Sequence, residues 1–295
     1  LYILTGKYHR YEDVGGRLVG ARFEAPVPTL FEYLRGAFAV APHEAVIING
    51  EDRTDEEFYN FSNHHLFGVQ YRSTTLSLFR FKQHILRRQL EAGIDDDETR
   101  AEAEKRLAEM ESLDYRTGGR DLTSPEVEAF WDRWRERYGD SGLKCPRGDR
   151  LLTHLAVAAM DQLRPRLMMI NYNDPDYVHW GNPAFYFDGI RIIDHALERL
   201  VAAVEADPFY AGNTVFVVVP DCGRDSNRMM HVPFQHHFGS RTSHEIFALV
   251  FGRGVPSGKV VDRPVDQTSI AATVGGLMGF EARFAEAAAL EEVFA

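Results

Sequence analysis

The pattern of apolar and polar positions becomes a regular alternation of helices and strands after about residue 146. Stretches that are apolar on one helical face predict helices, and short continuous apolar runs predict strands that are buried on both faces. The expected order is a helix over 151–162, a strand over 167–171, a helix over 185–206, strands over 214–219 and 246–251, and a helix over 267–278. This alternation is typical of an α/β fold with a largely parallel sheet.

Three further features describe the first half of the chain. Pro28 and Thr29 precede a run with helical spacing over 30–35, and the β-branched run over 46–49 predicts a strand. The range 74–139 is rich in charged residues that favour helices, which predicts solvent-facing helices forming an insertion or cap. We therefore expect a single domain over 1–295 that contains this helical insertion.

Composition excludes several classes of protein. A chain of 295 residues with 44% hydrophobic and 26% charged residues can bury a full core, and it contains no apolar run of the length that a membrane span needs. The net charge of −11 disfavours nucleic acid as the main partner, so a small anionic substrate would need local positive charge, such as a bound metal ion. Two cysteines do not form a disulfide framework, and neither the compartment nor the oligomeric state can be read from the sequence.

Residues that bind metals follow the predicted strand over 167–171. Asp176 and His179 are separated by two residues and lie where strands of α/β proteins present ligand sites, beyond their carboxyl ends. A carboxylate and a neutral imidazole are common ligands of zinc. The alternative is structural: Asp174 or Asp176 caps the following helix, and His179 packs beside Trp180.

A second group follows the predicted strand over 214–219. Asp221 ends this apolar run and is a candidate ligand, or else an acid in a turn where Gly223 allows the backbone to reverse. Cys222 is either a thiolate ligand or a small buried side chain. Arg224 can orient an anionic substrate or serve in an ion pair.

Histidines are concentrated in the next loop. Four of the chain's 12 histidines lie between residues 231 and 244, a density that packing does not readily explain. They are His231, His236, His237 and His244, and Arg241 lies among them.

Taken in chain order, these segments resemble the alkaline phosphatase superfamily, in particular the type I phosphodiesterases and sulfatase-like hydrolases. The similar stretches cover most of the chain outside the charged range. They are Leu4-Thr5-Gly6-Lys7-Tyr8-His9, the helix start Pro28 to Leu34, the pair Asp176 and His179, the series Tyr186, Ile190 and Asp194, the strand ending in Asp221-Cys222-Gly223, the loop His236-His237, the run after Glu245, and the closing helix from Gln267 to Phe280.

The resemblance implies a three-layer α/β/α sandwich and two divalent metal ions, zinc or alternatively manganese. One ion would be held by Asp176, His179 and His237, with His236 as the alternative to His237. The other would be held by Asp221 with Cys222, a position at which the family usually has histidine. Arg224 is the expected substrate contact.

The resemblance also implies hydrolysis of phosphate monoesters or diesters through a Ser, Thr or modified Cys nucleophile. That nucleophile is expected upstream of Leu1, so we expect an N-terminally truncated chain that is inactive by itself. The alternatives are a sulfate ester hydrolase, or a non-catalytic member that binds an anion or a partner. Many relatives are exported, which makes a periplasmic or extracellular location an expectation by resemblance.

Overall fold

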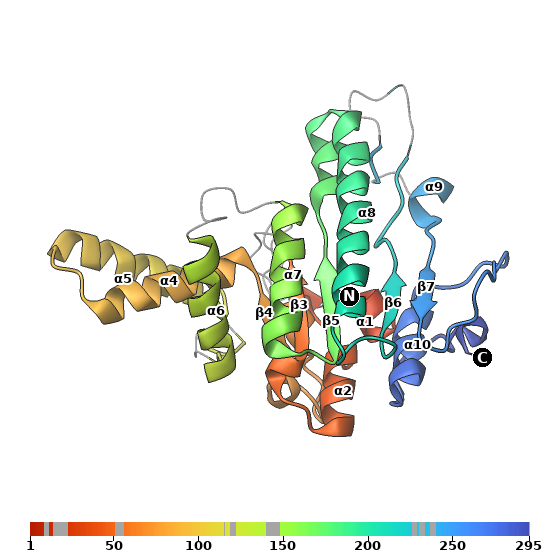
Figure 1. Ribbon diagram of the computed structural model, residues 1–295, viewed down its shortest axis with the longest axis horizontal. Coiled ribbons are helices and arrows are strands. Elements are labelled where there is room, and N and C mark those ends of the chain that lie inside the picture. Colours follow the sequence, from red (N-terminus) through yellow and green to blue (C-terminus); the bar gives the residue numbers. More distant parts are fainter. Residues whose placement is uncertain are drawn as a thin grey trace.

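The computed structural model describes residues 1–8, 12–13, 23–50, 56–114, 116–118, 122–139, 148–225, 229, 234–236 and 240–294. Within these ranges the protein is a mixed α/β structure (Figure 1). Strand β3 (Ala45–Asn49) lies between β4 (Thr74–Leu76) and β5 (Leu167–Asn171), and it runs parallel to both. Strands β6 (Val215–Val218) and β7 (Leu249–Gly252) pair antiparallel, as do the two-residue strands β1 (Glu12–Asp13) and β2 (Phe23–Glu24).

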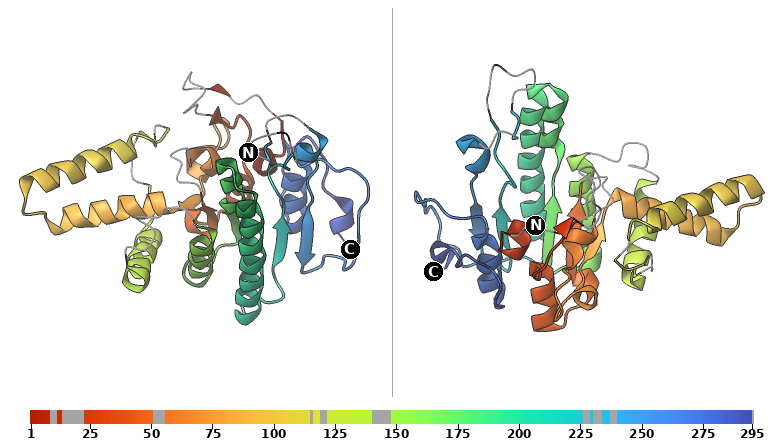
Figure 2. Two further views of the ribbon diagram at one scale, coloured as in Figure 1. Left: turned by 90° about the horizontal axis from the view of Figure 1, so that it is seen from above. Right: turned by 180° about the vertical axis from the view of Figure 1, so that it is seen from behind.

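Strand β3 is buried on both faces because its side chains alternate between two cores. Val46 and Ile48 belong to one apolar cluster, which includes residues of the helices that follow residue 125. Ala45 and Ile47 belong to the other, which includes residues from the first helices and from the C-terminal part. This alternation is the period of two expected of a strand, and it requires helices on both sides of the sheet (Figure 2).

The helices divide between these two cores. Helices α7 and α8 pack on the side of Val46, and α2 and α10 pack on the side of Ile47. The helices are α1 (Tyr2–Thr5), α2 (Leu30–Phe38), α3 (Glu57–Asn60), α4 (Leu78–Ala92), α5 (Asp97–Glu111), α6 (Pro125–Tyr138), α7 (Asp149–Leu163), α8 (Pro183–Ala206), α9 (Arg241–His244) and α10 (Ser269–Met278). Short 3₁₀ segments cover Pro42–Glu44, Val69–Tyr71, Asp174–Trp180 and Glu291–Val293.

Most of the elements predicted from the sequence are confirmed, including the mixed α/β class. The helix after Pro28 begins with a capping box, in which Thr29 accepts a hydrogen bond from the backbone of Glu32, and the Glu32 carboxylate accepts one from the backbone of Thr29. The differences include two in the C-terminal strands. Strand β7 begins at Leu249 instead of 246, and the β6 and β7 pair is antiparallel, so within the described residues the parallel arrangement covers β4, β3 and β5.

The charged range 74–139 has two structural parts. Helices α4 and α5 form a hairpin that projects from the rest of the molecule (Figures 1 and 2) and contains a small apolar cluster of its own. Helix α6 buries Phe130, Trp131 and Trp134 in the core around Val46, and the first half of α4 adds Phe81 and Ile85 to the same core. The prediction of solvent-facing helices is therefore wrong for α6 and for the first half of α4, because these apolar residues are buried. Among the described residues, none of the helices combines the length and apolar character that a membrane span requires.

Candidate metal centre

The candidate site begins where β5 ends, in the 3₁₀ segment Asp174–Trp180. Asp149, at the start of α7, holds the first residues of this segment: its carboxylate accepts hydrogen bonds from the backbone N–H of Asn173 at 2.9 and 3.0 Å, and from that of Asp174 at 2.7 Å. Helix α8 also packs against the segment at Gly189, where a Cβ atom would lie 2.6 Å from the backbone nitrogen of Pro175. Both α7 and α8 thus hold the start of the segment that carries Asp176 and His179.

Three of those residues converge. The carboxylate Oδ1 of Asp176 lies 2.9 Å from Nε2 of His179, and this Nε2 lies 3.0 Å from Nε2 of His236. The three ligand atoms all lie within 4.8 Å of one another, and the three side chains are partly buried. One carboxylate oxygen and two imidazole nitrogens at these separations could hold a metal ion.

His179 has a partner at each ring nitrogen. Arg224 donates from Nη1 to Nε2 of His179 at 2.8 Å. Arginine has no acceptor, so this contact uses the tautomer in which Nε2 presents its lone pair and Nδ1 carries the proton. In that tautomer Nδ1 donates to Oε1 of Gln235 at 2.7 Å. It is also the tautomer that a metal ligand needs, with its other nitrogen bound to an outer partner.

Arg224 also binds the carboxylate of the cluster. Its Nη2 lies 2.8 Å from Oδ1 of Asp176. Partial burial alone would raise the pKa of Asp176, but the hydrogen bond from Arg224 and the nearby positive charge bring that pKa below its ordinary value. Asp176 is consequently ionised at neutral pH, as a metal ligand must be.

Backbone contacts bring the histidine loop to this position. The N–H of Asp225 donates to the carbonyl oxygen of Gln235 at 2.6 Å, which joins the segment after β6 to the segment that carries His236. The N–H of Gly223 donates to the carbonyl of Ser243 at 2.8 Å. A Cβ at Gly223 would lie 2.1 Å from the carbonyl oxygen of Thr242, so glycine is needed here for close backbone approach. Gly223 is not among the glycines with positive φ, so the structure requires glycine here for space and not for a left-handed backbone.

Asp221 and Cys222 do not belong to the three-residue cluster. Asp221 is exposed, and its Oδ1 accepts a hydrogen bond from the N–H of Cys222 at 2.8 Å. Burial, followed by the negative charge of Asp221, raises the pKa of the Cys222 thiol to about 11. Cys222 is a thiol at neutral pH in the metal-free protein. Within the described ranges, the second expected pair is therefore not joined by a third ligand, and a second metal site stays a prediction.

The remaining sequence predictions have different outcomes. His236, which was the alternative to His237, supplies the second imidazole of the cluster. His231 and His237 lie outside the described residues. His244 lies on α9 and contacts the carbonyl oxygen of Ser240. Asn182, and not an aspartate, caps α8, since its side chain accepts a hydrogen bond from the backbone of Ala184. The alternative in which His179 packs beside Trp180 involves a side chain outside the described set.

Two residues that matter for the site were missed. Gln235 orients His179, and Asp149 holds the segment that carries Asp176. In the sequence, Gln235 is one polar residue beside two histidines, and Asp149 is an ordinary acid in the first turn of a helix. Neither pattern distinguishes a positioning residue from a solvated one.

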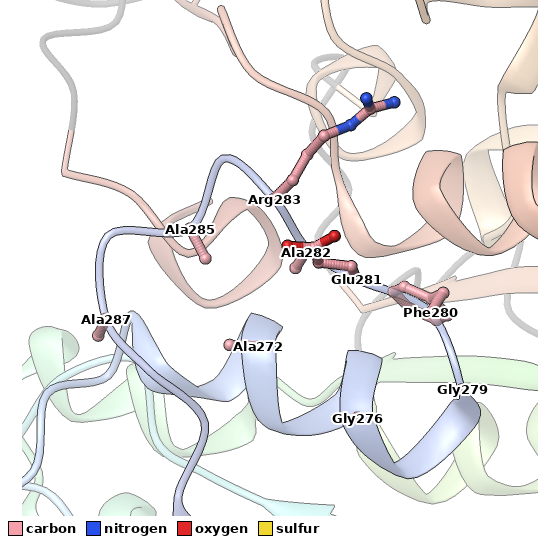
Figure 3. A pocket seen from close by; sticks show the side chains of 9 residues that line it. All are labelled: Ala272, Gly276, Gly279, Phe280, Glu281, Ala282, Arg283, Ala285 and Ala287. Atoms are coloured by element: carbon pink, nitrogen blue, oxygen red, sulfur yellow. The ribbon is translucent and has the colours of Figure 1, made fainter.

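A hollow near the C-terminus lies apart from this cluster. It is formed by the end of α10 and the following loop (Figure 3), and glycines and alanines make up most of its lining. Glu281 and Arg283 are its charged residues, and Arg283 points away from α10 in Figure 3. One carboxylate among small apolar residues is not a metal site, so the cluster around His179 remains the better candidate.

Comparison with known proteins finds no family model, no curated protein and no solved structure that matches this chain. Support for a function therefore comes from the geometry of the site together with the sequence motifs.

Asp149 offers a test of how the segment is held. Burial raises its pKa to about 6, although the backbone hydrogen bonds from Asn173 and Asp174 oppose this shift. The unfolded chain loses this proton near pH 4, so the folded state is destabilised as the pH rises from about 4 to about 6. The measured quantity is the difference in the free energy of unfolding between the wild type and Asp149→Asn. We expect the stability of the wild type relative to this variant to fall by about 2 to 3 kcal/mol between pH 4 and pH 6.

Urea unfolding of both proteins between pH 4 and pH 7 measures this difference, and the other titrating groups cancel in the subtraction. A difference that stays constant with pH would mean that the Asp149 carboxyl titrates normally in the folded protein.

Proposed function

We propose that the protein, in its complete form, is a metal-dependent hydrolase of phosphate monoesters or diesters. The observation that carries this proposal is the convergence of Asp176, His179 and His236 at the end of β5, with Arg224 beside them. The proposal extends the mixed α/β structure to a complete three-layer α/β/α sandwich. It agrees with the superfamily that the sequence motifs resemble.

The donor set suits zinc, and manganese is the alternative. Two imidazole nitrogens and one carboxylate oxygen are a common set in catalytic zinc sites, which keep a fourth position for water or substrate. When bound, such an ion supplies Lewis acidity and neutralises the charge of an anionic ester. Asp176 and His236 would ligate it, Gln235 would orient the ligand His179, and Arg224 would contact the ester oxygens.

A hydroxyl nucleophile preceding Leu1 belongs to this proposal. Leu1, at the start of α1, lies near Asp221, which follows β6. A Ser or Thr shortly before Leu1 would therefore also lie near Asp221. A second ion held by Asp221 and Cys222 would then lie beside the nucleophile.

A second candidate function is a non-catalytic member that binds an anion or a partner. Two observations favour it. Cys222 occupies the position at which the family has histidine, and within the described part of the chain Asp176, His179 and His236 form the single group of three ligands. This candidate predicts one bound ion, or none, and no turnover.

The test uses the complete protein, stripped of metal with a chelator and titrated with Zn²⁺ or Mn²⁺ by calorimetry. We expect one to two equivalents to bind, and metal-dependent hydrolysis of 4-nitrophenyl phosphate or bis(4-nitrophenyl) phosphate. Faster turnover of 4-nitrophenyl sulfate would reassign the substrate to sulfate esters. Metal binding without hydrolysis supports the non-catalytic candidate, and no metal binding by a folded protein rejects the metal centre.

A further inference from the structure

Arg224 occupies the position in which a metal ion would meet its ligands. Its guanidinium donates to Nε2 of His179 and to Oδ1 of Asp176, both at 2.8 Å, and these are two of the three atoms of the metal cluster. The side chain of Arg224 is only 10% exposed. In this structure the cation that neutralises Asp176 is therefore a guanidinium.

We propose that Arg224 and a divalent ion compete for these ligand atoms, and that metal binding turns Arg224 into a binding site for a tetrahedral oxyanion. Metal and oxyanion then bind cooperatively through this one residue. The inference rests on the proposed metal centre. It adds the class of ligand, a tetrahedral oxyanion, and the order of events: the metal ion displaces Arg224 from its ligands, and Arg224 then binds the oxyanion.

Competition follows from the number of lone pairs. A neutral imidazole has one acceptor nitrogen, and the contact with Arg224 requires this to be Nε2 of His179, which leaves Nδ1 to donate to Gln235. Nε2 cannot accept a hydrogen bond from Arg224 and ligate a metal ion with the same lone pair. Binding of the ion must break the contact between Arg224 and His179, and repulsion between the two cations acts in the same direction.

The released guanidinium needs a new partner. An arginine that is mostly buried and loses its hydrogen bonds carries a large desolvation penalty. A tetrahedral oxyanion matches it, because two oxygens can take the guanidinium in a bidentate manner while a third faces the metal ion. With ionised Asp176 and two neutral imidazoles, the site would have a charge of about +2 once the ion is bound, which favours an anion in a protein whose net charge is −11.

The test measures Mn²⁺ affinity from the electron paramagnetic resonance of the free ion, with and without millimolar inorganic phosphate, for the complete protein and for Arg224→Gln. Without phosphate, Arg224→Gln should bind Mn²⁺ at least about tenfold more tightly, because a charge-assisted hydrogen bond no longer competes. Phosphate should tighten Mn²⁺ binding to the wild type by about tenfold and should leave Arg224→Gln nearly unchanged.

Arg199→Gln is the matched control, because Arg199 on α8 also contacts an imidazole, that of His154, but lies outside the cluster. It should behave as the wild type does. The effect of phosphate on the wild type is informative even if Arg224→Gln does not fold, since no effect overturns the cooperativity. Metal binding that Arg224→Gln leaves unchanged or weakens overturns this inference but not the metal centre, whereas no Mn²⁺ binding by the wild type overturns both.

Discussion

Replacing His179 with alanine is expected to weaken Zn²⁺ binding by the complete protein at least about a hundredfold, since loss of an outer partner of a ligand already costs 10- to 100-fold. His179 contacts both other members of the cluster, so its loss leaves Asp176 and His236 without the group between them. Any metal-dependent hydrolysis should fall in parallel. Calorimetric titration of the chelator-treated proteins measures the affinity.

Two variants calibrate this result. His195→Ala removes an exposed histidine of α8 that pairs with Glu198, and it should leave Zn²⁺ affinity unchanged. Gln235→Ala should reduce the affinity by about 10- to 100-fold, because His179 keeps its ligand atom but loses the acceptor that orients it. If His179→Ala binds Zn²⁺ as tightly as His195→Ala does, the cluster is not the metal site.

Replacing Gly223 with alanine is expected to destabilise the protein by about 2 to 4 kcal/mol and to weaken metal binding as well. The added Cβ would lie 2.1 Å from the carbonyl oxygen of Thr242 and 3.0 Å from that of Glu245, and a backbone carbonyl cannot move aside as a flexible side chain can. The segment must therefore shift, and it carries Arg224 and the contact of Asp225 with Gln235. Urea unfolding measures the stability, and metal titration measures the effect on the site.

Gly36→Ala is the control for Gly223→Ala. Gly36 lies in α2, and the nearest atom to its added Cβ is a ring carbon of Phe67 at 3.3 Å, which can shift slightly. Alanine is favoured over glycine in a helix by about 1 kcal/mol, so this variant should be as stable as the wild type or slightly more so. A Gly223→Ala protein of unchanged stability would show that the two backbone segments do not depend on their close approach.

Local signals account for the parts of the fold that the sequence predicted. The helix after Thr29 was predictable because its start is encoded within four residues, and the strands over 46–49 and 167–171 were predictable because their apolar runs are short and continuous. The direction in which β7 pairs with β6 was not, since an apolar run determines burial but carries no information on its partner. The burial of Trp131 in α6 was also not predicted, because charged residues dominate the composition of the range 74–139.

The candidate site divides in the same way. An acid and a histidine that follow an apolar strand made Asp176 and His179 candidates from the sequence alone, since strand ends in an α/β fold present ligand sites. Arg224 was a candidate because it follows the next predicted strand. Only the tertiary structure selected His236 within the described residues, recruited Gln235 and Asp149, and set Arg224 against the ligand atoms. The sequence by itself thus determined the α/β elements and the types of side chain at their ends. Which of these side chains meet was decided by contacts between segments more than 40 residues apart, such as His179 with His236, because hydrogen bonds of this range depend on the packing of the whole fold.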